Sequence, residues 1–445
     1  MRLGPLLASL SLLLLGALLP AAPVQAAAGP PVLVAAASYA DRDTTLRITA
    51  APQTEVLLER WDGSAWQTEG TVVTEPDGSA VVGVAVSRVP ERNLLRATAD
   101  ELSTQYRLPL RRIATTTRLS APATVVDEKT VTLTVVRRTS EGVAVPGPVL
   151  VQRVVDGAWR TVATLTVGST GQVSTRSQPR TDSRWRALGT TLPWATSSVS
   201  AQVRIDNVPA GKPVVLPRSA PRPRVALPAQ ARATGTGARP VVSRIPDATW
   251  RSMVGRTWHK GCPVGRSGLR LLRVNYWDYA GYRRRGELVA AASVVQQMAG
   301  ALSDMYDARL PIRSMYRVDR FGWSTRLQGG DDYTSMAAGN TSAFNCRWVV
   351  GKPGVRSPHS YGRSLDINTW ENPYRSRQGW VPNAWWASRS DARVAWRSRS
   401  HQVVQIMARH GLRWTYRTSD SQHFDAVPRG GRLIVVPGCG DAVCH

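Results

Sequence analysis

The chain has 445 residues, with 57 Lys and Arg against 31 Asp and Glu, which gives a formal net charge of +26. This length excludes a single small module and leaves room for two or three domains, each with a core of its own. The excess of arginine indicates anionic partners or reflects general composition and solubility. Nucleic acid is not an expected partner, because the arginines are scattered and no nucleic-acid-binding motif accompanies them.

The N-terminus predicts a secretory signal peptide over residues 1–26. Met1-Arg2 precede an apolar run from Leu6 to Leu19, and Val24-Gln25-Ala26 fits a small-residue cleavage site. The apolar run is about 14 residues long, short of the roughly 20 that span a bilayer, and no later segment is apolar enough to serve as an anchor. We expect a secreted protein, extracellular or cell-wall associated, with no membrane anchor after signal removal. Anionic cell-wall polymers are then possible partners.

Residues 28–206 contain an internal repeat. Glu59-Arg60 and Trp66-Gln67-Thr68 match Gln152-Arg153 and Trp159-Arg160-Thr161 at a constant offset of 93 residues. Short alternating strands and Asp-Gly turns flank both copies. We predict two all-β immunoglobulin-like sandwiches, residues 28–110 and 111–206, with Trp66 and Trp159 buried in their cores rather than exposed for stacking on sugars.

The composition changes twice beyond the repeat. Residues 207–240 are rich in Pro and Arg, which predicts an extended, semi-rigid linker. Apolar residues then recur at helical spacing over Gly286–Arg309 and over Ser398–His410, the second run ending at Gly411. Strand-like runs surround these helices at Leu269–Val274, Gly411–Tyr416 and Arg432–Val436. Residues 241–445 are therefore predicted to form an α+β domain.

All four cysteines lie in this C-terminal half, at positions Cys262, Cys346, Cys439 and Cys444. An even count in an exported protein favours two disulfides. Of the three possible pairings we favour Cys262 with Cys346 and Cys439 with Cys444. The competing interpretation makes Cys439, Cys444 and His445 a metal site.

Two of the six histidines, His359 and His423, stand out by the residues around them. His359 precedes Asp366 by seven residues, and His423 follows Asp420 by three. Two His and one Asp supply the N and O donors of a catalytic zinc that keeps a position open for water. A carboxylate that is not a ligand can take the proton from that water. Taken alone, the spacing of His359 and Asp366 is a weak signal that two unrelated loop residues would also produce.

The surrounding sequence strengthens this interpretation. Ser357-Pro358-His359-Ser360-Tyr361-Gly362-Arg363-Ser364-Leu365-Asp366 resembles the Ser-x-His-x-x-Gly-x-Ala-x-Asp signature of VanY-like zinc D-alanyl-D-alanine carboxypeptidases, a group related to D-Ala-D-Ala dipeptidases and phage L-alanyl-D-glutamate endolysins. Ser364 stands where the signature usually has Ala. Asp420 to Phe424 resembles the second motif of the same group. The resemblance covers roughly residues 241–436 and is also carried by Gly261-Cys262-Pro263, Pro311-Ile312, Ser335-Met336, Asn340-Thr341-Ser342-Ala343-Phe344-Asn345-Cys346-Arg347 and Asn372-Pro373-Tyr374.

The resemblance implies a role for each matching residue. The zinc (Zn2+) ligands would be His359, Asp366 and His423, the general base Asp420, and the substrate-facing arginine Arg347. A guanidinium can stabilise the oxyanion formed when a peptide carbonyl is attacked. Ser357 would hydrogen-bond substrate or hold the His359 loop. Asp425 is a predicted hydrogen-bond partner of a metal-bound histidine.

The predicted fold is thus multidomain, with two N-terminal immunoglobulin-like sandwiches followed by an α+β zinc peptidase domain. The predicted function is a secreted zinc-dependent peptidase that hydrolyses peptidoglycan stem peptides, foremost a D-alanyl-D-alanine carboxypeptidase. An L-alanyl-D-glutamate or cross-link endopeptidase would use the same residues. An inactive wall-binding protein is the alternative from another class of function. A serine D,D-peptidase is not expected, because the sequence lacks the Ser-x-x-Lys motif that such an enzyme requires.

Overall fold

The computed structural model describes residues 29–349 and 352–434 and divides the chain into two compact units. One unit runs to Ser120 and continues over Leu133–Thr175 and Trp185–Val203; the other comprises Ala121–Thr132, Arg176–Arg184 and the chain from Arg204 on. The predicted signal peptide, residues 1–26, and the predicted Cys439–Cys444 pair with His445 lie outside the described residues. Among the described residues, no helix is long and apolar enough to cross a membrane.

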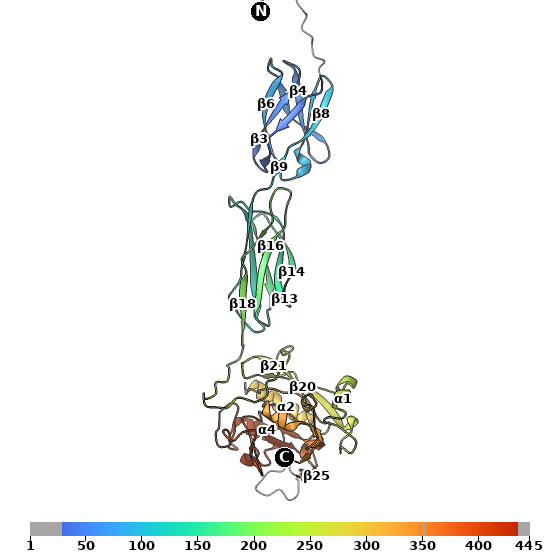
Figure 1. Cartoon of the computed structure of the whole chain (residues 1–445), viewed down its shortest axis with the longest axis vertical. Helices are drawn as coiled ribbons and strands as arrows, with labels where there is room; N and C mark the ends of the chain where they lie inside the picture. Colours follow the sequence, from blue (N-terminus) through green and yellow to red (C-terminus); the bar gives the residue numbers. More distant parts are fainter. Residues whose placement is uncertain (1–28, 350–351, 435–445) are drawn as a thin grey trace, which may run out of the picture. The chain divides into compact units, whose positions relative to one another are not determined.

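The first β-module consists of short antiparallel strands, as the alternating pattern predicts (Figure 1). One sheet has the order β1-β3-β6 and contains β1 (Val32–Ala35), β3 (Asp43–Thr49) and β6 (Ser79–Ala85). The other has the order β5-β4-β7-β8 and contains β4 (Glu55–Trp61), β5 (Trp66–Val73), β7 (Leu94–Ala99) and β8 (Leu102–Arg107). The short strands β2 (Ser38–Tyr39) and β9 (Leu110–Arg111) pair in parallel. Leu46, Ile48, Val56 and Leu95 are fully buried between the sheets.

The second β-module repeats this organisation. One sheet has the order β10-β12-β15 and contains β10 (Thr115–Ser120), β12 (Val131–Thr139) and β15 (Gln172–Ser177). Another contains β13 (Gly147–Val155), β14 (Ala158–Val167), β16 (Ser183–Gly189) and β17 (Ser198–Val199). The strands β11 (Thr124–Val126) and β18 (Val203–Val208) pair in parallel. The repeat extends to the β-bulges, which interrupt the pairing at Leu58/Glu59 in one module and at Val151/Gln152 in the other.

The prediction that Trp66 and Trp159 fill the sandwich cores is wrong. Both side chains are only partly buried. The guanidinium of Arg96 lies 4.5 Å from the ring centroid of Trp66, and that of Arg186 lies 4.5 Å from Trp159. Each tryptophan therefore packs against an arginine two strands away in the same sheet, an arrangement in which the ring faces the cation instead of the core.

The C-terminal region is α+β, and its central hairpin joins two long strands, β20 (Leu269–Trp277) and β21 (Arg283–Ala291). Its helices are α1 (Asp247–Met253), α2 (Val295–Asp307), α3 (Asp332–Ala337) and α4 (Gln402–Arg409). A second sheet has the order β26-β30-β29 and contains β26 (Ser364–Asp366), β29 (Leu412–Arg413) and β30 (His423–Ala426). The other strands are β19 (Val241–Ser243), β22 (Trp323–Ser324), β23 (Gly329–Gly330), β24 (Trp348–Val349), β25 (Lys352–Arg356), β27 (Tyr374–Ser376) and β28 (Gly379–Val381).

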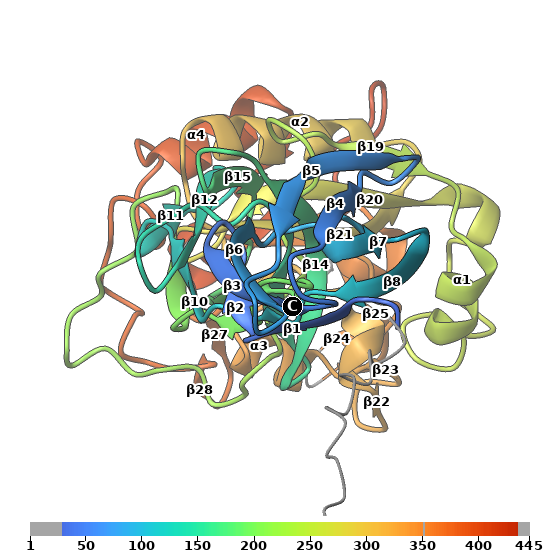
Figure 2. The ribbon, with the colours of Figure 1, turned by 90° about the horizontal axis from the view of Figure 1, so that it is seen from above.

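Both predicted helices exist, but both are shorter than the sequence suggested, and α4 covers Gln402–Arg409 of the predicted Ser398–His410. Residues 286–291 belong to β21, and α2 begins only at Val295. Strand β21 is buried along most of its second half, so its continuous apolar run imitated a helical pattern. The helices α2 and α4 lie side by side (Figures 1 and 2), and both contribute to one core with the two sheets. That core supports the strands that carry the candidate site.

Residues 209–240, called the strap from here on, differ from the extended spacer that their composition predicted. Backbone hydrogen bonds tie Gly211 to Gly281, Val214 to Tyr279 and Ala233 to Arg283. The side chain of Gln230 is buried, accepts hydrogen bonds from the Tyr276 hydroxyl and the Met315 amide, and donates to the Met315 carbonyl.

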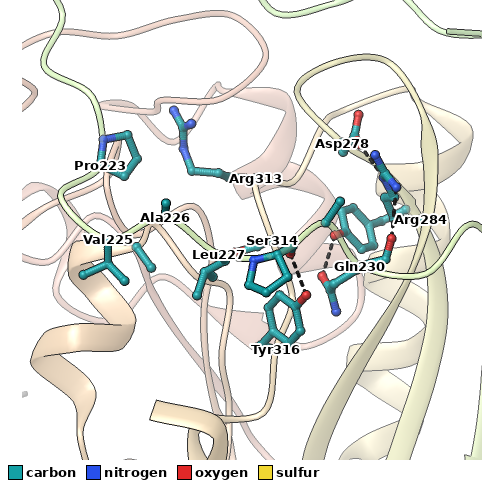
Figure 3. Close-up of a pocket in the computed structure, with 14 residues that line it drawn as sticks. Pro223, Val225, Ala226, Leu227, Gln230, Asp278, Arg284, Arg313, Ser314 and Tyr316 are labelled. Atoms are coloured by element: carbon teal, nitrogen blue, oxygen red, sulfur yellow. Dashed lines mark hydrogen bonds and ion pairs between the residues drawn. The ribbon is translucent and has the colours of Figure 1, made fainter. Parts of the chain in front are cut away.

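Beside Gln230, the strap and the domain enclose a cavity of about 310 Å³ (Figure 3). On its domain side, Arg284 pairs with Asp278, and the Tyr316 hydroxyl donates to the Pro228 carbonyl. The strap is therefore a packed part of the C-terminal domain.

Candidate metal centre

Two short antiparallel strands, β26 and β30, place the predicted ligands opposite each other. Their register pairs Asp366 with His423, Leu365 with Phe424, and Ser364 with Asp425. Because side chains alternate across a strand, the four polar residues share one face and the two apolar residues share the other. Leu365 and Phe424 are fully buried in the core, which fixes this register.

His359 comes from a separate turn, a 3-10 helix over Pro358–Tyr361. Gly362 ends the turn with φ of 66°, and a Cβ at this position would lie 2.7 Å from the backbone nitrogen of Ala291. Glycine is therefore required here both for its left-handed conformation and for close packing. This local geometry explains the glycine of the signature and brings His359 against β26 and β30.

The three predicted ligands converge. His359 Nε2 lies 3.2 Å from His423 Nδ1 and 3.2 Å from Asp366 Oδ2, and His423 Nδ1 lies 3.0 Å from Asp366 Oδ1. All three residues are buried, and one ligand atom from each lies within 4.8 Å of the others.

The remaining ring nitrogens are already engaged. His359 Nδ1 lies 2.7 Å from the carbonyl oxygen of Ala343, and His423 Nε2 lies 2.9 Å from Asp425 Oδ1. Both partners accept hydrogen bonds, so in neutral imidazoles these nitrogens carry the protons and the other two present lone pairs to each other. Two lone pairs beside a carboxylate form a donor set that suits a cation such as Zn2+.

The electrostatics of His423 agree with this arrangement. Burial disfavours its imidazolium, but the charge of Asp425 and the hydrogen bonds and charge of Asp366 outweigh burial and raise its pKa well above 6.5 in the metal-free protein. The same environment attracts any cation, and a metal ion would replace the proton.

Arg347 is fully buried and its Nη2 lies 2.8 Å from Asp332 Oδ2. Its backbone connects it to the His359 turn, since Ser360 Oγ donates to the Arg347 carbonyl and accepts from the Arg347 amide. Sequence reasoning missed Asp332. The sequence signal for this residue is the pair Gly329-Gly330 shortly before it. A Cβ at Gly329 would lie 2.6 Å from the Cβ of Arg347, so glycine is what lets this segment approach Arg347 closely.

Asp420 is fully buried and directly precedes Ser421, Gln422 and His423. It forms an isolated β-bridge with Tyr374. Burial raises the pKa of Tyr416, and the nearby charges of Asp425 and Asp420 add to this shift. The Tyr416 ring centroid lies 5.3 Å from that of His423.

Ser357 is buried at the start of the His359 turn. Its hydroxyl accepts a hydrogen bond from the His359 amide, and its own amide donates to the Arg347 carbonyl. These contacts favour the loop-holding role over a substrate contact.

Cys262 and Cys346 form a disulfide that spans 84 residues. Cys346 belongs to the segment Ser342–Arg347, whose backbone bonds Asp366 through Ser342 and His359 through Ala343 and Asn345. This segment therefore joins the two ligand-bearing elements, and the disulfide fastens it to the region before β20.

Three further histidines lie away from the centre. His401 caps α4 by accepting from the Val403 amide, and burial lowers its pKa. His410 pairs with Asp304, and His259 lies near the backbone carbonyls of Gln328 and Cys346. None of the three joins the His359, Asp366 and His423 cluster.

Comparison with solved structures finds similarities of low identity. Invasin, a bacterial integrin-binding protein, is 13% identical with a TM-score of 0.29, over 57% of this chain and 48% of invasin. Salmonella alpha-2-macroglobulin reacted with methylamine is 12% identical with a TM-score of 0.19, over 55% of this chain and 18% of that protein. The D0-D1 domain of intimin is 13% identical with a TM-score of 0.17, over 40% of this chain and 99% of that domain. The chain thus spans less than two thirds of the first two proteins.

No curated protein sequence matches the chain at a significant level. Residues 350–426, which include the three converging residues and Asp420, match the family of D-alanyl-D-alanine carboxypeptidases, and this confirms the VanY-like resemblance of the C-terminal domain.

Proposed function

We propose that the C-terminal domain is a zinc-dependent peptidase that hydrolyses peptidoglycan stem peptides. Its main activity in this proposal is that of a D-alanyl-D-alanine carboxypeptidase. The observation that carries this proposal is the convergence of His359 Nε2, His423 Nδ1 and the Asp366 carboxylate, with the other ring nitrogens held by Ala343 and Asp425. The family match over residues 350–426 supports the substrate class.

In the proposed mechanism, His359, Asp366 and His423 would hold Zn2+, which when bound would supply the Lewis acidity that polarises a carbonyl and lowers the pKa of water. Asp420 accepts the proton of the attacking water and later donates it to the leaving amine. A buried carboxylate is suited to this exchange because few water molecules compete for the proton.

Arg347 supplies positive charge for the oxyanion that develops on the scissile carbonyl. Its ion pair with Asp332 and its backbone link to Ser360 hold the guanidinium in place relative to the His359 turn. Such a fixed donor needs little reorganisation as charge develops, and this is the main source of electrostatic catalysis.

The proposal includes secretion, with the protein extracellular or associated with the cell wall. The β-modules would then space or dock the C-terminal domain on the wall, and the positive charge would favour anionic polymers. An L-alanyl-D-glutamate or cross-link endopeptidase remains the second candidate, because the metal centre serves any of these amide bonds.

The test is mass spectrometry of purified stem peptides incubated with the zinc-loaded protein. Loss of one terminal D-Ala is the expected result, and cleavage within the stem would assign an endopeptidase instead. A His423→Ala protein and a chelator-treated sample are the controls. If the zinc-loaded protein cleaves no stem peptide, the proposed enzymatic function is wrong and the wall-binding alternative takes its place.

A further inference from the structure

We propose that Ser364 and Thr415 are positioning residues that clamp Asp425, which in turn orients His423 for the metal. This inference rests on the proposed metal centre and concerns side chains behind the ligands. Ser364 occupies the position where the VanY-like signature usually has Ala, so it adds a hydroxyl that the signature does not require.

Each oxygen of the Asp425 carboxylate has its own hydroxyl donor. Ser364 Oγ donates to Oδ1 over 2.7 Å, and Thr415 Oγ1 donates to Oδ2 over 2.7 Å. Oδ1 also lies 2.9 Å from His423 Nε2. Donors to both oxygens prevent rotation of the carboxylate, so the direction in which it holds the imidazole is fixed.

The donors come from opposite sides of β30. Ser364 lies on β26, directly across from Asp425 in the antiparallel register, and Thr415 follows β29, the strand that pairs with the other edge of β30. The sheet itself therefore delivers both hydroxyls. Because Leu365 and Phe424 pin the register from the core side, a slip that would separate Ser364 from Asp425 is unfavourable.

The cost of losing a clamp follows from burial. Asp425 is 3% exposed, so water cannot readily replace a missing donor. Loss of the Thr415 hydroxyl would take the donor from Oδ2, and loss of the Ser364 hydroxyl would leave His423 as the partner of Oδ1. Either change would let the carboxylate turn and carry His423 with it. The lone pair of Nδ1 would then point less accurately at the space shared with His359 and Asp366.

The experiment measures zinc affinity of the full chain by competition with a chromogenic chelator, a readout independent of peptide hydrolysis. Loss of an outer-shell partner costs about 10- to 100-fold in metal affinity, which we expect for Asp425→Asn. Ser364→Ala and Thr415→Val each remove one of the contacts that hold Asp425 and should weaken zinc binding by about 3- to 10-fold, less than the loss of Asp425 itself. Thr415→Ser keeps the hydroxyl and should retain the wild-type affinity.

A matched control removes a buried hydroxyl elsewhere in the same domain. Ser314 is buried, and its hydroxyl hydrogen-bonds Asn340; neither residue belongs to the cluster of His359, Asp366 and His423. Ser314→Ala should lower thermal stability as Ser364→Ala does, yet leave the zinc dissociation constant unchanged.

The outcomes separate the two proposals. Asp425→Asn could weaken zinc binding while the zinc dissociation constants of Ser364→Ala and Thr415→Val match the wild-type value within twofold. The proposed role of the two hydroxyls would then be wrong, and the proposed metal centre would be retained. If the wild-type chain binds no zinc, the proposed function fails first. Equal weakening by Ser314→Ala would also overturn the clamp, because general destabilisation would then explain the result.

Discussion

The first β-module and the C-terminal domain bury different kinds of side chain. The first module encloses Leu46, Ile48, Val56 and Leu95, and its buried polar residues are uncharged. The C-terminal domain buries a set of ionisable groups around one point, namely Arg347, His359, Asp366, Asp420, His423 and Asp425. Burying such groups costs free energy unless they are paired, so their concentration in one place indicates a site that is maintained for its chemistry. The first module shows how the same chain builds a core without buried ionisable side chains among residues 29–110.

The largest effect on folding should come from removing the strap. The β-modules have no corresponding segment. A fragment of residues 241–445 loses Gln230, whose amide satisfies the Tyr276 hydroxyl and the Met315 backbone, and exposes the surface beneath. We expect this fragment to aggregate or to lack a cooperative thermal transition. A fragment of residues 209–445 should show one. Equal melting behaviour of the two fragments would mean that the strap is a spacer after all.

Asp420→Asn should remove most of the peptidase activity while the C-terminal domain stays folded. The substitution keeps the size of the side chain but removes the carboxylate that exchanges the proton, and loss of a general base costs about 10²- to 10⁴-fold in kcat. Zinc affinity should be retained, since Asp420 is not among the three converging ligands. Kinetics on a stem peptide and chelator competition on the same preparation check both statements; full activity would exclude Asp420 as the base.

Leu46→Ala tests the other side of the comparison. Leu46 is fully buried in the first module, and truncation of such a side chain costs about 2–5 kcal/mol. Denaturant unfolding should show a destabilised first module. Hydrolysis by the C-terminal domain should be unchanged at temperatures where the module stays folded. A parallel loss of zinc affinity would show that the two regions are not energetically separate.

The smallest effect is a pH dependence confined to the metal centre. In the metal-free protein the pKa of His423 lies well above 6.5, because Asp425 and Asp366 outweigh burial. Zinc must displace that proton, so apparent zinc affinity should fall about tenfold for each pH unit below this pKa. Chelator competition between pH 8 and pH 6 measures the slope. A flat profile would contradict a protonated His423 in the metal-free centre.

Sequence patterns anticipated more of the site than of its surroundings. His359, Asp366 and His423 were predictable because each stands in a motif whose donors suit one metal. The contact of Ser364 with Asp425 and that of Asp332 with Arg347 depend on strand register and packing between distant segments, which no local pattern encodes. The strap was misread because Pro-rich composition predicts extended backbone but does not reveal whether that backbone is solvated or docked. Strand β21 was misread because a strand buried on both faces has no alternation.

The Cys262–Cys346 bond makes oxidation a step in building the scaffold of the candidate metal centre. Cys346 lies within the segment that contacts both His359 and Asp366, so while its thiol is free that segment is held by noncovalent contacts alone. A closed loop of this size restricts the unfolded chain, and bonds of this type persist only where the surroundings are oxidising. Under the proposed function, hydrolysis of the cell wall before export would endanger the cell. A centre whose scaffold is completed by oxidation would delay its full assembly until the chain has left the reducing cytoplasm.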